Sequence, residues 1–394
     1  MEETDMEKVL FEVTEDHLET GMRGYPVGYC TTSYVDPIKG LFYKGRPIAE
    51  LCKKEPEQVI YLLYHGEEGS ETDVTRFAEE LKKRGRCSQA VIKHILSLPG
   101  SGDPMQLFAS AILISGMVEG GKRDYREDAL HLIAKIPHLA ATVINHHAGW
   151  GETPPPDRKM GYMENFARML RAPQGNEKQL AEIFRLFNVM HYDHGGGNLS
   201  AFVGKAVASG LEDLYGSVAS SMCALAGPRH GRANRDCLEF VRSILDELGE
   251  APSSRELEEL IRKRMEEKKL IYGFGHTVLR AEDARATLFY ETALAQFPAH
   301  PLVKIALSLR GIVPDILKEL SRITSPYPNV DAISGTVLVA SGFPHPEYFT
   351  VLFGMARVVG ISLQIIYERC EARGGKGTPI VRPKYLYTGK KAEN

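Results

Sequence analysis

The stretch LAEIFRLFNVMH, residues 180–191, predicts an amphipathic helix and sets the fold class. Its apolar side chains recur three and four residues apart, which places them in one stripe along a helix. The side chains of this stripe are Leu180, Ile183, Phe184, Phe187 and Met190. A stripe of this kind faces a protein core, so the stretch is typical of a globular helical protein.

The same helical spacing recurs along the chain. Residues 103–118 form a predicted buried helix with Asp103 as the N-cap and Pro104 at the first helical position. Residues 236–249 repeat the apolar spacing, and residues 255–269 form a predicted helix with a charged, solvated face. The prolines in 150–159 predict a surface loop.

Strand patterns are few. The best candidates are LFEVT at 10–14 and GLFYKG at 40–45, both near the N-terminus. We detect no repeat of solenoid period and no low-complexity linker. The sequence therefore predicts an all-α fold whose domains pack closely against one another.

The composition is that of a soluble globular protein: of 394 residues, 43% are hydrophobic and 25% are charged. A net charge of −3 gives no basic surface that would indicate nucleic-acid binding. The six cysteines are scattered without a C-x-x-C pair, which favours reduced thiols in a cytosolic compartment. The N-terminal MEETDMEK is acidic and no apolar run follows it, so no targeting segment is indicated and we expect a cytoplasmic protein.

One segment has the length of a membrane span. Residues 348–367, YFTVLFGMARVVGISLQIIY, carry a single charge, Arg357, near the middle. No second such segment accompanies it, and its polar residues favour a buried core helix over a membrane span. A guanidinium in such a helix requires a paired anion, so Arg357 indicates an anionic partner.

Five short stretches place His, Asp or Arg in turn-forming contexts, often at a predicted helix end. They are HYDHGGGN (191–198), GPRHGRAN (227–234), GFGHTVLRAEDAR (273–285), PNVD (328–331) and VRPKY (381–385). Catalytic groups are often held on loops between rigid elements. Together the stretches offer histidines, a carboxylate and several arginines, a combination that suits an anionic substrate and acid–base chemistry.

Metal and dinucleotide sites are the alternatives for these stretches. His191 and His194 are three residues apart, but the three following glycines end the helix that would place both on one face. No His-Glu-x-x-His motif occurs, so we predict no metal site. Gly273-x-Gly275 lacks a third glycine and a βαβ context, which disfavours a dinucleotide fold.

Five stretches together resemble one family. GPRHGRAN, GFGHTVLRAEDAR, PNVDAISG, FGMARVVG and VRPK occur in the order and nearly the spacing of the signature stretches of citrate synthases. The resemblance runs from about residue 20 to about residue 388, and GMRG and HYDHGGGN are most similar to the animal and yeast members. It implies a homodimer with a citrate-synthase-like two-domain helical fold: a large domain of 1–228 and 337–394, and a smaller, mobile domain of 229–336.

The resemblance also implies residue roles. His230 would hydrogen-bond the thioester oxygen of acetyl-CoA, His276 would polarise the ketone of oxaloacetate, and Asp331 would remove the methyl proton. The other implied ligands are His194, Arg285, Arg357 and Arg382 for oxaloacetate or citrate, and Arg280, Arg23, Gly273, Gly275 and Asn329 for CoA. Arg382 would come from the other subunit. Asn198 and Ser200 would orient neighbouring groups, and His191 keeps the simpler interpretation of a helix end.

The implied reaction condenses acetyl-CoA with oxaloacetate and water to give citrate and CoA. It needs no cofactor and no metal, and neither nucleic acid nor a membrane is an implied partner. A 2-methylcitrate synthase acting on propionyl-CoA stays open, because one methylene in an apolar pocket changes binding by only about 1–3 kcal/mol. A non-catalytic helical scaffold that binds acyl-CoA is the alternative from another class.

Three positions depart from the family's usual pattern. Gly195 stands where a Glu commonly follows the substrate-binding histidine, so we expect His194 to lack a supporting contact. Arg229 and Arg232 bracket His230 where smaller or apolar residues are usual. Their positive charges are expected to favour the neutral form of His230.

Overall fold

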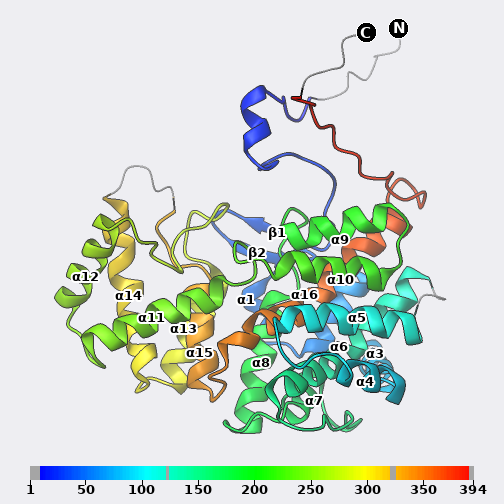
Figure 1. Cartoon of the computed structure of the whole chain (residues 1–394), viewed down its shortest axis with the longest axis horizontal. Helices are drawn as coiled ribbons and strands as arrows, with labels where there is room; N and C mark the ends of the chain where they lie inside the picture. The colour runs from blue at the N-terminus through cyan, green and yellow to red at the C-terminus, as the bar shows by residue number, and fades with distance from the viewer. Residues whose placement is uncertain (1–8, 121–123, 320–324, 390–394) are drawn as a thin grey trace.

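The structure, a computed structural model, describes residues 9–120, 124–319 and 325–389, and it is built mainly of helices (Figure 1). The predicted all-α class is confirmed. The helices of the main body are α1 (Ile48–Leu51), α2 (Pro56–His65), α3 (Glu71–Arg84), α4 (Gln89–Leu96), α5 (Pro104–Glu119), α6 (Tyr125–Ala148), α7 (Tyr162–Met169), α8 (Glu177–His191), α9 (Leu199–Ser209), α10 (Leu214–Leu225) and α16 (Phe349–Ile366).

The apolar helix α16 runs through the middle of this body. It packs against α6, α8, α9 and α10 (Figure 1). The segment Pro346–Glu371, which contains it, has the length and hydropathy of a membrane span, yet 94% of its most apolar window is buried inside the protein. This is the position of a core helix in a soluble protein, as the sequence predicts.

The predicted helices are present, and their ends differ from the predicted ones by up to three residues. In α5, Asp103 Oδ1 accepts a hydrogen bond from the Met105 backbone N–H at 2.8 Å and Pro104 is the first helical residue. Asn176 caps α8 by accepting from two backbone N–H groups, and α8 ends at His191. Capping satisfies N–H groups that have no partner inside the helix, so both starts are fixed by local sequence.

One strand prediction is right and one is wrong. GLFYKG contains β2 (Gly40–Tyr43), which pairs antiparallel with β1 (Ser33–Asp36) and β3 (Arg46–Pro47). LFEVT at 10–14 is not a strand: this segment has no regular structure, and Leu10 is 69% exposed. An alternating pattern makes a strand only where a neighbouring strand accepts its hydrogen bonds, and none pairs with this segment among the described residues.

A second group of helices lies beside the main body (Figure 1). It consists of α11 (Ala233–Leu248), α12 (Ser254–Glu266), α13 (Ala284–Gln296), α14 (Pro301–Lys318) and α15 (Asp331–Ala340). Within the group, α11 packs on α14 and α15, α12 on α14, and α13 on α15. The division into domains at residues 228 and 337 stays a prediction.

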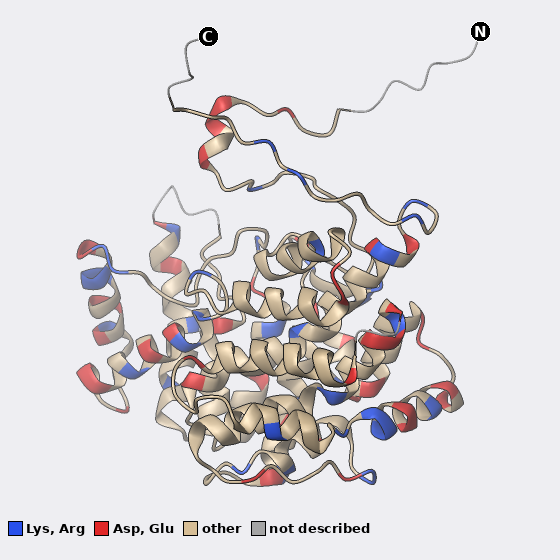
Figure 2. Cartoon of the chain, turned by 45° about the vertical axis from the view of Figure 1, so that its right-hand side comes forward, with Lys and Arg blue, Asp and Glu red and all other residues tan. Residues whose placement is uncertain are grey.

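The two ends of the described chain run outside the body. The N-terminal segment contains the short helix η1 (Glu15–Glu19) (Figure 1). Near the other end, η2 (Pro346–Tyr348) leads into α16, which continues as the π-helical η3 (Tyr367–Glu371), and the C-terminal segment begins after η3. Charged residues of both signs are interspersed along the helices (Figure 2).

Candidate active site

The loop after α8 is held against α16 by hydrogen bonds at successive turns. The Nε of Arg357 donates to the carbonyl of His191 at 3.1 Å. One turn later, the backbone N–H of Gly360 donates to the carbonyl of Tyr192 at 3.0 Å. A Cβ on Gly360 would lie 2.3 Å from that carbonyl oxygen, so the close approach requires glycine.

Asp193 anchors the same loop from inside the protein. Its carboxylate is fully buried and accepts hydrogen bonds from Thr32 Oγ1, from Ser33 Oγ at 2.8 Å and from Gln364 Nε2 at 2.7 Å. A buried carboxylate is stable only when it is paired or hydrogen-bonded, and these three donors provide the bonds. The backbone on either side of His194 is thereby fixed.

His194 faces His276, with the two ring centroids 5.7 Å apart. Its Nε2 is buried and has no hydrogen-bond partner among the described residues. Burial, followed by the positive charges of Arg285 and Arg357, holds the pKa of His194 well below its usual value. Gly195 has a φ of +73°, and a Cβ added there would have no atom within 4 Å. Because glycine has no side chain, this position gives His194 no side-chain contact, as expected.

His276 is held in one tautomer by its own loop. Its Nδ1 accepts hydrogen bonds from the backbone N–H groups of Val278 at 3.0 Å and Leu279 at 2.9 Å. An atom that accepts two N–H bonds cannot itself carry a proton, so the proton of the neutral ring lies on Nε2. Burial and the Arg285 charge lower the pKa of His276, which favours this neutral form.

Asn329 connects the loop of His276 to that of Asp331. Its backbone N–H donates to the carbonyl of Gly273 at 2.9 Å, and its Nδ2 donates to the carbonyl of Gly275 at 3.0 Å. Gly273 has a φ of +83°, and a Cβ there would lie 2.7 Å from the Cα of Ala332. Glycine is therefore required for the close contact between the two loops.

Asp331 is the first residue of α15. Its backbone N–H donates to Oδ1 of Asn329 at 3.0 Å. Burial raises the pKa of its carboxyl to about 6, although the positive charges of Arg285 and Arg357 act in the opposite direction. A carboxylate with a raised pKa is a stronger base, as proton abstraction from carbon requires.

His230 meets the start of α9. Its Nε2 accepts a hydrogen bond from the backbone N–H of Ser200 at 3.2 Å, and Oγ of Ser200 lies 3.0 Å away. Because a backbone N–H only donates, the proton of the neutral ring lies on Nδ1. Burial first, and then Arg357, lower its pKa to about 4. The neutral form expected for His230 is favoured, but the cation that accounts for it is Arg357, and the expected effect of Arg229 and Arg232 stays a prediction.

Arg285 has a counter-ion within its own chain. Asp283, the N-cap of α13, accepts from Nε of Arg285 at 3.1 Å and from Nη2 at 2.7 Å. Both side chains are buried, with 5% and 1% exposed. The pair keeps the pKa of Asp283 low, at about 2, so this carboxylate is ionised at neutral pH.

Arg357 differs from Arg285. It is 2% exposed, and no carboxylate of the described chain lies within 4.0 Å of it. Its described contacts are the carbonyl of His191 and the ring of Phe353, 4.7 Å from the guanidinium carbon. Burial lowers its pKa to about 10, against the opposing negative charges of Asp193 and Asp331, so the group stays charged at neutral pH with no carboxylate in direct contact.

Three of the predicted ligands lie on the surface. Arg382 and Arg23 are exposed, in the C-terminal and N-terminal segments that run outside the body (Figure 1). Arg280 is exposed and its Nη1 donates to carbonyls of its own loop. The roles of all three in ligand binding stay predictions.

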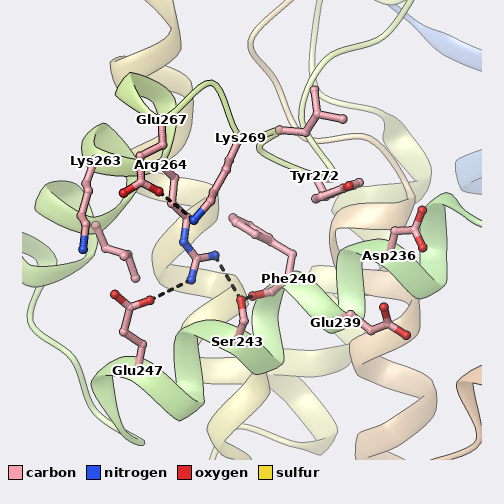
Figure 3. A pocket seen from close by; sticks show the side chains of 12 residues that line it. Asp236, Glu239, Phe240, Ser243, Glu247, Lys263, Arg264, Glu267, Lys269 and Tyr272 are labelled. Carbon is pink, nitrogen blue, oxygen red and sulfur yellow. Dashed lines mark hydrogen bonds and ion pairs between the residues drawn. The ribbon is translucent and has the colours of Figure 1, made fainter.

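A separate cavity of about 630 Å³ lies between α11 and α12 (Figure 3). Four of its charged side chains form two ion pairs: Arg264 donates to Glu247 at 3.1 Å, and Lys269 lies 2.7 Å from Glu267. It contains none of the predicted site residues. Among the described residues, no group of three or more His, Cys, Asp or Glu side chains could hold a metal. The predicted absence of a metal is left to a chelation experiment.

Sequence reasoning missed Asp193, Asp283 and Gln364. Asp283 had a local signal, since an Asp directly before a predicted helix is a preferred N-cap. The partners of Asp193 are more than 150 residues away in the chain, so no local pattern could have indicated its contacts.

Comparison with known sequences gives the family. Residues 21–384 match the family described as citrate synthase, C-terminal domain. The chain belongs to the citrate synthase family. A mitochondrial citrate synthase of Citrus maxima is 36% identical over 399 residues, which cover 95% of this chain and 83% of the relative.

Solved citrate synthases have the same fold. The enzyme from Pyrobaculum aerophilum gives a TM-score of 0.81 at 27% identity and covers 95% of this chain and 93% of its own. A Thermoplasma acidophilum citrate synthase, solved with carboxymethyl coenzyme A and oxaloacetate, gives a TM-score of 0.81 at 23% identity, with 95% and 97% covered. That likeness shows the fold alone.

The comparisons do not support the cytoplasmic location expected from the sequence. The names of the Citrus maxima relative and of a 35% identical relative from Arabidopsis thaliana describe mitochondrial proteins. The finer likeness to animal and yeast members stays a prediction.

Proposed function

We propose that the protein condenses acetyl-CoA with oxaloacetate and water, giving citrate and CoA. Membership of the citrate synthase family supports this reaction. The observation that carries the proposal is Arg357, a buried cation with no carboxylate within 4.0 Å in the described chain. A dicarboxylate substrate supplies the missing anion, and an arginine binds a carboxylate with two parallel hydrogen bonds.

In the first step, the Asp331 carboxylate takes a proton from the methyl group of acetyl-CoA. Negative charge then develops on the thioester oxygen, where Nδ1–H of His230 donates a hydrogen bond. A fixed donor at that oxygen stabilises the enol as it forms. The backbone N–H of Ser200 supports this role, since it keeps the His230 proton on Nδ1.

In the second step, the methyl carbon attacks the ketone carbon of oxaloacetate and the new carbon–carbon bond forms. The ketone oxygen becomes an alkoxide and takes a proton from Nε2 of His276, the nitrogen that carries it in the free protein. His194, whose Nε2 has no partner among the described residues, donates to oxaloacetate. Water then cleaves the thioester: its oxygen bonds to the acyl carbon, and CoA leaves as its thiol with one of the water protons. The proton that Asp331 took is released and replaces the one that His276 gave up, so both groups return to their starting states.

A third cation completes the site. Among the described residues, the buried Arg285 already pairs with Asp283, whereas the buried Arg357 has no carboxylate within 4.0 Å and feels Asp193 and Asp331 only from farther away. Oxaloacetate carries two negative charges, and citrate carries a third carboxylate. We infer that Arg382 of a second subunit supplies the further charge in a symmetric homodimer. Arg280 and Arg23 bind the CoA phosphates. The loop beside CoA is shaped by Gly273, Gly275 and Asn329.

The test is release of free thiol from acetyl-CoA in the presence of oxaloacetate, with propionyl-CoA in parallel. Acetyl-CoA is expected to give the higher kcat/KM. A preference for propionyl-CoA would make the protein a 2-methylcitrate synthase, and no thiol release from either would leave an acyl-CoA-binding scaffold. Activity should survive exhaustive chelation, since no step uses a metal.

A further inference from the structure

The side chain of Arg280 lies against the loop that carries His276. Its Nη1 approaches four consecutive carbonyl oxygens, those of residues 276, 277, 278 and 279, at 3.5, 3.2, 3.0 and 2.9 Å. The backbone N–H of Arg280 donates to the carbonyl of Pro37 at 2.7 Å, at the turn between β1 and β2. Arg280 is thus held at its backbone N–H and at one guanidinium nitrogen, although the residue is exposed.

The carbonyls that face Arg280 belong to the peptide groups that hold His276. The peptide between Thr277 and Val278 directs its carbonyl at Nη1 of Arg280 and its N–H at Nδ1 of His276. The peptide between Val278 and Leu279 does the same. Two peptide groups therefore lie between the guanidinium and the imidazole, each hydrogen-bonded on both sides.

We propose that Arg280 is a positioning residue for His276 and acts on it through these two peptide groups. A cation at a carbonyl polarises the peptide, so its N–H becomes a stronger donor. Two strengthened donors at Nδ1 keep the ring proton on Nε2 and make that N–H a better donor to the ketone oxygen of oxaloacetate. The effect reaches the ketone without any contact between Arg280 and oxaloacetate.

This role deepens the proposed function and rests on it. Only Nη1 of Arg280 bonds to the loop in the described structure, so Nη2 and Nε can receive a CoA phosphate at the same time. One guanidinium thereby links the phosphate end of acetyl-CoA to the histidine that polarises the other substrate.

The experiment uses the full chain with Arg280→Met, Arg280→Lys and, as a matched control, Arg76→Met. Arg76 lies on α3 with 78% of its side chain exposed. Magic-angle-spinning NMR of ¹⁵N-histidine protein reports which nitrogen of His276 carries the proton in the free protein, with the signal assigned from its loss in His276→Asn. The ¹³C shift of the keto carbon of bound oxaloacetate, without CoA, reports ketone polarisation.

In Arg280→Met we expect the His276 proton to divide between Nδ1 and Nε2, and the keto-carbon shift to move towards its value in free oxaloacetate. The kcat should fall roughly ten- to a hundredfold, as when a catalytic group is displaced by a fraction of an ångström. Arg280→Lys retains a cation near the carbonyls and should keep most of the polarisation, and Arg76→Met should match the wild type.

Wild-type ¹⁵N and ¹³C shifts in Arg280→Met would overturn the proposal, even if KM for acetyl-CoA rose, because that pattern is expected of a CoA ligand alone. Failure of the proposed function has a different signature. In that case the wild-type protein would show no bound oxaloacetate signal, while the ¹⁵N measurement on the free protein would still test the link between Arg280 and His276.

Discussion

Arg285 and Arg357 are both buried, but only Arg285 has a carboxylate of the described chain in contact with it. Arg285 is buried beside Asp283 and bonds to it through two nitrogens, so its charge is balanced within the chain. Arg357 is buried in the apolar helix α16 with a carbonyl and a ring as its described contacts. A paired buried arginine is explained by the fold, whereas an arginine without an adjacent anion indicates a ligand.

Both arginines act on Asp331, the proposed catalytic base, and its replacement gives the largest expected effect. Each lowers the pKa of Asp331, against the larger effect of burial. Replacement by Asn removes the base but keeps the size of the side chain, so Asp331→Asn should lower kcat by about 10²–10⁴-fold. Oxaloacetate binding by calorimetry should be retained. Near-normal turnover would show that Asp331 is not the base, and the effect of Arg285 and Arg357 on its pKa would then have no part in catalysis.

Arg382, the proposed third cation of the site, gives a second test of the two-arginine comparison. If Arg382 serves the site of the partner, mixing Arg382→Ala chains with His276→Ala chains gives heterodimers with one intact site. About half the dimers are mixed, so subunit exchange between two nearly inactive proteins should recover up to about a quarter of wild-type thiol release. No recovery, with exchange verified by native mass spectrometry, would place Arg382 outside the shared site.

The stability of two matched variants tests the comparison itself. Arg285→Met leaves the Asp283 carboxylate buried and unpaired, which should lower the free energy of unfolding by about 3–5 kcal/mol. Arg357→Met removes a buried charge and leaves no carboxylate within 4.0 Å unpaired, since Asp193, which acts on Arg357 from farther away, keeps its own three hydrogen bonds. Its free energy of unfolding should stay within about 1 kcal/mol of the wild type. Urea unfolding measures both, and equal destabilisation of the two variants would contradict the difference drawn between them.

Sequence patterns predict much of this picture for a clear reason. The helices α5, α8 and α16 follow from their apolar residues, and the start of α5 follows from its N-cap Asp103; the cap of α8, Asn176, was not predicted. The anion requirement of Arg357 follows from one charge in an apolar run. The segment 10–14 was predicted wrongly, because a strand depends on a partner elsewhere in the chain.

The site is less predictable from sequence than the helices. The family resemblance supplied His230, His276 and Asp331, but not the bonds that set their protonation. These hydrogen bonds depend on loop conformations that only the structure provides. Ser200 donates to Nε2 of His230, and the backbone N–H groups of Val278 and Leu279 donate to Nδ1 of His276.

The smallest expected effect is a dependence of stability on pH. The folded-state pKa of Asp331, about 6, lies above the ordinary value of 3.8, so ionising this group opposes folding. The penalty is absent below about pH 4, grows as the pH rises from 4 to 6, and is constant above 6. Asp331→Asn should therefore be more stable than wild type above pH 6, by up to about 3 kcal/mol. Thermal unfolding at pH 4 and pH 8 should show the difference only at pH 8, and an equal difference at both would contradict the raised pKa.

The central claim is that oxaloacetate is the anion that Arg357 lacks, and calorimetric titration of oxaloacetate into wild type and Arg357→Met tests it most directly. Two charge-assisted hydrogen bonds contribute about 3 kcal/mol or more. The wild type is therefore expected to bind one oxaloacetate per chain, and the folded variant to bind at least about a hundredfold more weakly. Binding of equal affinity in the two proteins would contradict the claim, and Arg357 would then be a buried charge whose anion is some other molecule.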